Sequence, residues 1–307
     1  MKIVSIIVTY NALRNDWLYK CLDSLLSSEM HTDIVVVDNA SSDETCTVIK
    51  EKYPFVKLIE NSENKGFGAA NNQGFEYGIT INADYFFLLN QDAWIESNTI
   101  ALLIEAHQKE PQFGIVSPIH LNGEGKALDY KFSNYIIPSK CQDLFSDILT
   151  SRLKKELYEV SFVNAASWLL SKGCMEKVGG FNPSFFHYGE DDNYIHRLYF
   201  HKLKLGVLPT AIIYHDREER SSNIYFDNQL ITYKRGLILK VSNPIINYSF
   251  NLEYRKLYKI AFKSCLVLNL KLSKEILKKI KILNDLNRKQ IEQNKIISKI
   301  ANPTFVK

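Results

Sequence analysis

The sequence has few cysteines and no long apolar run, and these absences exclude several classes of protein. Its five cysteines are scattered, with no CxxC pair and no Cys/His cluster, so neither structural zinc nor a disulfide framework is supported. We therefore expect a protein of the reducing cytosol. No apolar run approaches the ~18–20 residues of a membrane span. The apolar residues 3–8 are too few for a signal-peptide core and no small-residue cleavage site follows them, so a buried strand fits better.

Charge is plentiful but unevenly distributed. The 307 residues, 46% of them hydrophobic, can form one large domain or two smaller ones, and their net charge is +4. From Asn251 to Lys307 there are 14 Lys and Arg and 4 Asp and Glu, a balance of +10, whereas the remainder has 24 and 30, a balance of −6. An acidic body with a strongly basic C-terminal tail indicates two separate tasks.

Strand-like and helix-like segments alternate over the first ~120 residues. Runs rich in Ile, Val, Leu and Phe predict strands at residues 2–10, 33–40, 56–61, 85–93 and 113–118. Helical spacing and capping signals predict helices at residues 17–28, 41–53, 66–79 and 97–109. This alternation predicts an α/β fold with a mostly parallel sheet flanked by helices.

The rest of the chain is less regular. The patterns predict a flap-like insertion at residues 120–160 and a strand at 161–172. They then predict a turn-rich stretch at 179–192, a helix at 193–203 and a strand region at 204–216. From about residue 225 onward the chain is helical in pattern and basic.

Polar residues stand where three predicted strands end, and ligands of such sheets bind at the carboxyl ends of the strands. They are Thr9, Tyr10 and Asn11, then Asp38 and Asn39, then Asn90, Gln91 and Asp92. Helix capping explains the polar residues after Asn39 but not Asp38, which could hydrogen-bond a ribose or a base. Asp92 could be a helix cap, or it could be a hard oxygen ligand for Mg²⁺ or Mn²⁺.

A glycine-rich stretch, residues 66–74, opens the third predicted helix. It is neither a Rossmann fingerprint, which would follow the first strand, nor a Walker A loop. It could be a plain turn. Its small residues also allow a ligand to approach the backbone closely, and the side chains of Asn71 and Asn72 could contact polar edges of that ligand.

Three carboxylates, Glu190, Asp191 and Asp192, stand side by side. Like charges in contact repel, so the cluster is either a solvated surface turn or a site that needs negative charge. His215, at the end of the last strand region, could be a structural histidine. Together with Asp92 and the acidic cluster, it becomes a candidate metal ligand.

Six stretches of residues 3–222, in this order, resemble the inverting family 2 glycosyltransferases with a GT-A fold. They are SIIVTYNA, IVVVDNASSDET, NKGFGAANNQG, LLNQDAWIE, GGFNPSFFHYGEDDNYIHR and IIYHDREERS. The likeness is to bacterial rhamnosyltransferase-like enzymes of O-antigen and capsule assembly. It implies a GT-A (Rossmann-like) catalytic domain at residues 1–222, with a nucleotide-sugar-binding half at 1–118 and an acceptor half at 119–222. The remaining residues, 223–307, form a basic helical C-terminal extension.

The resemblance also implies a role for each matching residue. The nucleotide-sugar pocket would be formed by Thr9, Tyr10, Asn11, Asp38, Asn39, Gly66, Phe67, Gly68, Asn71, Asn72, Asn90 and Gln91. Asn90, Gln91 and Asp92 occupy the position of the family's DxD motif, with Asn90 in place of the first Asp. Asp92 and His215 would then hold Mn²⁺ or Mg²⁺. Asp191 would be the catalytic base, paired with Glu190, with Asp192 as the second choice.

The implied reaction is the transfer of a sugar from a dTDP- or UDP-linked donor to a hydroxyl of a cell-envelope glycan or its lipid-linked precursor. No QxxRW stretch is present, so we expect one sugar per encounter rather than processive synthesis. The alternatives are an inactive sugar-nucleotide-binding scaffold and a nucleotidyltransferase. The latter is disfavoured because a single arginine and no glycine follow the first strand.

The basic tail carries a helical apolar stripe at Ile276, Ile280, Leu283 and Leu286. The stripe could pack on the catalytic domain or on a second subunit, which leaves a homodimer open. It could instead attach the protein peripherally to anionic lipid at the inner face of the membrane. Nucleic acid is not expected as a partner, because the body is acidic and no recognised binding motif occurs.

Overall fold

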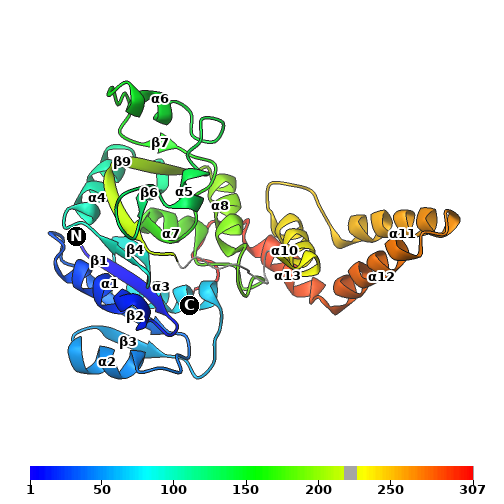
Figure 1. Ribbon diagram of the computed structural model, residues 1–307, viewed down its shortest axis with the longest axis horizontal. Coiled ribbons are helices and arrows are strands. Elements are labelled where there is room, and N and C mark those ends of the chain that lie inside the picture. The colour runs from blue at the N-terminus through cyan, green and yellow to red at the C-terminus, as the bar shows by residue number, and fades with distance from the viewer. Residues whose placement is uncertain (218–226, 307) are drawn as a thin grey trace.

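The computed structural model describes residues 1–217 and 227–306, and its centre is one mixed, mostly parallel sheet (Figure 1). The strands are β1 Ile3–Thr9, β2 Asp33–Asp38, β3 Lys57–Glu60, β4 Tyr85–Asn90, β5 Ala93–Ile95, β6 Phe113–Asn122, β7 Tyr158–Glu159, β8 Ser167–Ser171 and β9 Lys204–His215. Their order is β3-β2-β1-β4-β8-β6-β9-β5, and β7 also pairs with β9. The long ladders of β1 with β2 and β4, and of β6 with β9, are parallel, whereas β8 runs antiparallel between β4 and β6.

Helices cover both faces of this sheet, so each face carries its own apolar core (Figure 1). The helices of the body are the short 3-10 helix η1 Arg14–Asp16, then α1 Trp17–Leu26, α2 Thr45–Lys52, α3 Phe67–Thr80, α4 Thr99–Lys109, α5 Tyr130–Ser133, α6 Leu144–Leu149, α7 Lys172–Val178 and α8 Glu190–Phe200. Neighbouring residues of β4 illustrate the arrangement, because Phe86 packs into one core and Phe87 into the other. The predicted α/β class and the predominantly parallel sheet are confirmed.

Several element boundaries differ from the prediction, and two of these differences bear on the site. The segment 161–172, predicted as one strand, contains only β8, because the Ser171 hydroxyl accepts a hydrogen bond from Cys174 N at 3.2 Å and so caps α7. Helix α8 begins at Glu190 rather than after the acidic cluster. The three acids thus occupy its first turn, where the partial positive charge of a helix N-terminus stabilises negative charge.

The segment 123–160 is irregular, as predicted, but it is packed rather than loose. Phe132, Cys141, Leu144 and Tyr158 are buried in the core on one face of the sheet. The segment therefore forms a fixed wall next to the carboxyl ends of β6 and β9.

The C-terminal part is helical, as predicted. Its helices are α10 Gln229–Ser242, α11 Phe250–Leu266, α12 Leu270–Asp285 and α13 Arg288–Ile297. Helices α11 and α12 form a hairpin that projects from the body, in orange in Figure 1. The stripe of Ile276 and Leu283 is buried inside this helical region, together with Leu257 and Ile291. Among the residues that the structure describes, no helix is long and apolar enough to cross a bilayer.

The chain returns to the body after α13. Gly180 N donates to Thr304 O at 2.7 Å, and the Asn72 side chain donates to Phe305 O at 3.0 Å. At the other end of the helical region, the Asn193 side chain of α8 donates to the Ser242 hydroxyl of α10 at 3.0 Å. The extension is thus joined to the body at both of its ends.

Candidate active site

A cavity of about 770 Å³ lies where the ends of β4 and β9 meet the start of α8 and one face of α10. Its charged and amide lining includes Asn90, Asp92, Lys131, Asn164, Glu190, Asp191, Asp192, His215, Arg217 and Arg235. Aromatic side chains, among them Trp17, Phe67, Tyr135 and Phe162, complete the walls. The candidate metal ligands and the acidic cluster therefore line one cavity, although Asp92 is 98 residues from Glu190 in the sequence.

Asp92 and His215 meet because β5 pairs antiparallel with β9. The pairing sets Ala93 opposite His215, so that Asp92 Oδ1 lies 3.3 Å from His215 Nε2. His215 is buried, and neither of its ring nitrogens makes a hydrogen bond to the described residues. A carboxylate and an imidazole nitrogen are donors that Mn²⁺ accepts, so this pair fits one side of a metal site.

Behind His215 lies Asp129, a buried carboxylate that the sequence did not single out. Its Oδ2 lies 3.5 Å from His215 Nδ1 and accepts a hydrogen bond from Arg217 Nε at 2.5 Å. Its Oδ1 accepts from Phe132 N at 2.8 Å and caps α5, which fixes the carboxylate in place. Carboxylates in this position orient metal-binding histidines.

Asp92 is held in its charged form. Burial alone would raise the pKa of its carboxyl, but His215 and, to a smaller extent, Arg217 bring that pKa below its usual value. No group of three or more His, Cys, Asp or Glu side chains among the described residues is arranged to hold a metal by itself. Asp92 and His215 could therefore supply two ligands to a divalent cation, whose remaining ligands would come from water or from a bound molecule.

A second wall of the cavity, at the start of α8, has the reverse electrostatics. Burial raises the pKa of Glu190 to about 7, and burial together with the charges of Glu190 and Asp192 raises that of Asp191 well above its usual value. Burial also raises the pKa of Asp192, against the opposing charges of His196 and Arg235. A carboxylate with a raised pKa is a stronger base, which suits it to take a proton near neutral pH.

Gly189 connects this wall to α10. Its φ of +99° lies in the left-handed region, and a Cβ there would lie 3.1 Å from the Phe185 ring and 3.2 Å from Arg235 Cγ. A glycine thus allows the first turn of α8 to approach α10 closely. Arg235 enters the cavity in this way, from a part of the chain that the family resemblance does not cover.

The other predicted nucleotide ligands lie along the neighbouring strand ends. Asp38 is buried, and its carboxylate accepts from Thr9 Oγ1 at 2.9 Å and from Ser41 N at 2.8 Å. Tyr10 N donates to Gln91 Oε1 at 2.7 Å, which ties the end of β1 to the end of β4. These bonds hold the loops at the edge of the sheet beside the cavity.

The turn before α3 is fixed by a network of amides. Asn39 Oδ1 accepts from Lys65 N at 2.9 Å, and the Asn39 amide donates to Asn64 Oδ1, also at 2.9 Å. Gly66 has a φ of +86°, and a Cβ there would lie 2.0 Å from Phe186 O. Glycine is thus required at this position, both for its φ and for the close approach of the loop that contains Phe186.

The remaining predicted residues differ in their position relative to the cavity. Phe67 lines it, whereas Gly68 packs against Phe181. Asn71 donates to Phe67 O at 3.0 Å within its own helix. The Asn72 amide is bonded to backbone groups of Phe181 and Phe305, away from the cavity lining. Asn11, at a φ of +51°, accepts from Ser42 N at 2.8 Å and fixes the loop after β2.

A protein with this fold and a cavity of this kind belongs to a known class. Residues 5–179 match the family model described as glycosyl transferase family 2, and the chain belongs to this family. The low-salt glycan biosynthesis hexosyltransferase Agl10 of Haloferax volcanii is 28% identical over 209 residues, 64% of each chain. The N-acetylglucosaminyl-diphospho-decaprenol L-rhamnosyltransferase of Mycobacterium tuberculosis is 23% identical over 188 residues, 54% of this chain and 60% of the relative. The chain thus spans about three fifths of the length of these relatives.

Solved structures agree on the fold. The mannosyltransferase PcManGT from Pyrobaculum calidifontis, in complex with GDP-Man and Mn²⁺, superposes with a TM-score of 0.55 at 15% identity, over 97% of this chain and 73% of its own. The predicted GT-A fold is confirmed by this likeness.

Proposed function

We propose that the protein is an inverting glycosyltransferase, which moves one sugar per encounter from a dTDP- or UDP-linked donor to a hydroxyl of a cell-envelope glycan or its lipid-linked precursor. The observation that carries the proposal is that one cavity is lined both by Asp92, whose pKa is lowered, beside His215 and by three carboxylates whose pKa values are raised. The family membership and the names of the relatives, a hexosyltransferase and a rhamnosyltransferase, support it.

The two walls divide the chemistry. Asp191 accepts the proton of the acceptor hydroxyl while that oxygen bonds to the anomeric carbon from the face opposite the diphosphate. The bond between the anomeric carbon and the diphosphate oxygen breaks, its electron pair leaves with the nucleoside diphosphate, and the configuration inverts. A divalent cation bound by Asp92 and His215 would supply charge neutralisation to the leaving diphosphate. The carboxylate of Asp129, 3.5 Å from His215 Nδ1, is close enough to orient the His215 ring if a hydrogen bond forms between them when the cation binds.

A structural neighbour supports the role of the metal. PcManGT was solved in complex with a nucleotide sugar and Mn²⁺, and the pair of Asp92 and His215 is a donor set suited to such a cation in this chain. We infer that binding of the donor depends on Mn²⁺ or Mg²⁺.

The proposal is tested by thermal unfolding with a panel of UDP-, dTDP- and GDP-sugars, each with and without Mn²⁺. A ligand at 100 times its dissociation constant stabilises the folded state by about 2.7 kcal/mol. We expect a metal-dependent shift with one class of nucleotide, followed by transfer of that sugar to an acceptor. The proposal fails if none of the nucleotide sugars shifts the transition, and binding without transfer would indicate an inactive scaffold.

A further inference from the structure

The turn between α11 and α12 lies at the far end of the hairpin (Figure 1). Several of its apolar side chains are exposed. We define the apolar tip as Phe262, Leu266, Val267, Leu268 and Leu270, each of which is at least 67% exposed. These side chains are separate from the predicted stripe of α12, whose Ile276 and Leu283 are buried inside the hairpin and against α10. The apolar tip thus takes no part in that helical core.

The backbone conformation of the turn is unusual for an exposed leucine. Leu268 has a φ of +52° and is 83% exposed. It ends α11 in the left-handed conformation that glycine or asparagine ordinarily supplies, and a larger side chain is strained there. A turn suited only to water would have a small or polar residue at this position, so the leucine points to an apolar environment.

Positive charge surrounds the apolar tip. Between Arg255 and Lys281 the sequence has nine basic residues, Arg255, Lys256, Lys259, Lys263, Lys271, Lys274, Lys278, Lys279 and Lys281, and one acidic residue, Glu275. We define the basic collar as Lys259, Lys263, Lys271, Lys274 and Lys278, which lie on the two helices of the hairpin. A second copy of this hairpin would be repelled by the collar, whereas an anionic bilayer matches both the collar and the tip.

We propose that the apolar tip inserts into an anionic lipid bilayer, with the basic collar at the level of the lipid headgroups. Apolar side chains next to basic ones are the pattern of helices that bind at a membrane interface without spanning it. The attachment differs from the one expected from the sequence alone, because the buried stripe of α12 is not the membrane-facing surface.

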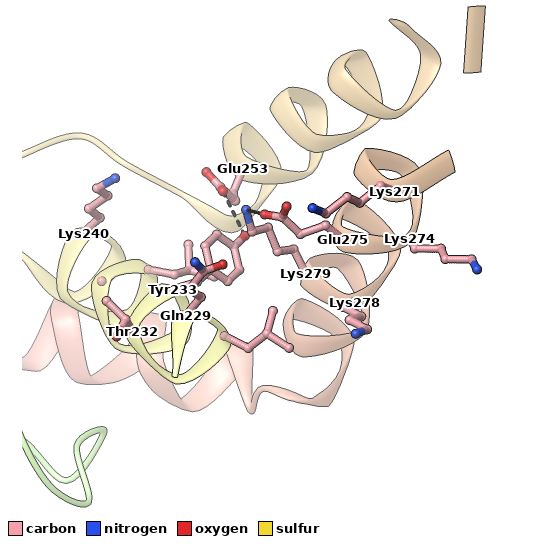
Figure 2. A pocket seen from close by; sticks show the side chains of 13 residues that line it. Gln229, Thr232, Tyr233, Lys240, Glu253, Lys271, Lys274, Glu275, Lys278 and Lys279 are labelled. Atoms are coloured by element: carbon pink, nitrogen blue, oxygen red, sulfur yellow. Dashed lines mark hydrogen bonds and ion pairs between the residues drawn. The ribbon is translucent and has the colours of Figure 1, made fainter. Parts of the chain in front are cut away.

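The base of the hairpin adjoins the active-site cavity. A groove of about 750 Å³ lies between α10 and α12 (Figure 2). It is lined by Tyr233 and Lys279 and also by Lys271, Lys274 and Lys278 of the collar. Thr232 and Gly236 of α10 line both this groove and the cavity. Insertion of the tip would tether the body, with its cavity, to the membrane that carries a lipid-linked acceptor. This purpose, but not the insertion itself, rests on the proposed function.

Vesicle sedimentation of the full chain tests the proposal, with phosphatidylcholine vesicles compared with vesicles that contain about one third phosphatidylglycerol. We expect binding to the anionic vesicles and a loss of about tenfold or more in partitioning for the triple variant L266S/L268N/L270S. The matched control is F145S/L149S/L153S, which removes three exposed apolar side chains on and after α6 and should bind as the wild type does. Unchanged binding of the tip variant, or an equal loss in the control, overturns the proposal.

The depth of insertion is measured separately, with a dye attached to the native Cys265 beside the apolar tip. Cys265 is exposed, whereas Cys21, Cys141 and Cys174 are buried, so a C46S background directs an environment-sensitive dye to Cys265. We expect the emission to shift to the blue on anionic vesicles and to be quenched by spin labels on the acyl chains. Binding without either change would mean surface contact only and would overturn insertion. A dimer that the tip variant dissociates, without vesicle binding by the wild type, would identify a self-association face and overturn the proposal.

These outcomes are distinct from a failure of the proposed function. The triple variant L266S/L268N/L270S leaves the cavity lining intact, so its thermal shift with the nucleotide sugar and Mn²⁺ should equal that of the wild type. Loss of vesicle binding with an unchanged nucleotide shift would therefore support insertion whether or not transfer is observed.

Discussion

The two walls of the cavity treat the same functional group in opposite ways. On the wall of β4 and β9, His215 and Arg217 outweigh burial and hold the pKa of Asp92 below its usual value. On the wall of α8, burial and mutual repulsion raise the pKa values of Glu190, Asp191 and Asp192. Charge partners, rather than depth alone, therefore decide which carboxylate stays charged for a cation and which can take up a proton.

The largest expected effect comes from removing the base. Asp191→Asn keeps the shape of the side chain but cannot accept the acceptor's proton, so we expect the rate of transfer to fall by about 10³-fold. Donor binding should remain near the wild-type level, because Asp192 and Glu190 still shape that wall. The measurement is the initial rate of transfer beside the nucleotide-dependent thermal shift. Asp192→Asn is the control, and if it is the more damaging of the two, the assignment of the base moves to Asp192.

The second-largest effect is expected from the wall of β4 and β9, where Asp92 lies. Asp92→Asn removes the charged ligand next to His215. We therefore expect the apparent affinity for Mn²⁺ in the presence of the donor to fall by about 10²-fold. A titration of Mn²⁺ against the thermal shift measures it. Asp191→Asn serves as the reciprocal control and should leave the titration unchanged. An unaltered midpoint in Asp92→Asn would remove this residue from the metal site.

The sequence predicted some of these features better than others. The strands β1, β2 and β4 follow from continuous apolar runs, and the polar residues at their ends follow from the geometry of parallel sheets. Asp129 and Arg235 could not be found in this way. Asp129 lies in an irregular segment, and Arg235 is one of many basic residues of the extension, so only tertiary packing distinguishes them.

The boundaries of α7 and α8 were also beyond the sequence patterns. Local apolar spacing continues from β8 into α7, and only the cap formed by Ser171 marks the change. The sequence pattern predicts the start of α8 at residue 193, because three adjacent acids are more typical of a turn than of a helix. Their position in the first turn follows from Gly189, whose left-handed conformation lets the helix begin directly against α10.

The third effect concerns stability. Glu190 is buried and its folded-state pKa is about 7, above the value of about 4.5 expected in the unfolded chain. Between these two pH values the folded state binds more protons than the unfolded state, so the free energy of unfolding falls as the pH rises. Glu190→Gln removes this cost, and we expect the variant to exceed the wild type by on the order of 2–3 kcal/mol at about pH 8.

Denaturant unfolding across the pH range measures this difference. Below about pH 4 the two proteins should converge, because the wild-type carboxyl is then protonated in both the folded and the unfolded state. Glu176→Gln, on the exposed side of α7, is the matched control and should follow the wild type throughout. Parallel curves for Glu190→Gln and the wild type would show that burial does not suppress the ionisation of Glu190.

The smallest effect tests the repulsion between the acids directly. The charge of Glu190 is one cause of the raised pKa of Asp191, so Glu190→Gln should lower the pKa of Asp191 while leaving its geometry in place. Transfer requires Asp191 in its charged form, and its rate should therefore fall toward low pH in both proteins. In the variant this acidic limb should lie at lower pH than in the wild type, because the repulsion from Glu190 has been removed. A limb that stays in place would mean that burial alone sets the pKa of the base, and the contrast between the two walls would then rest on solvent exclusion rather than on charge partners.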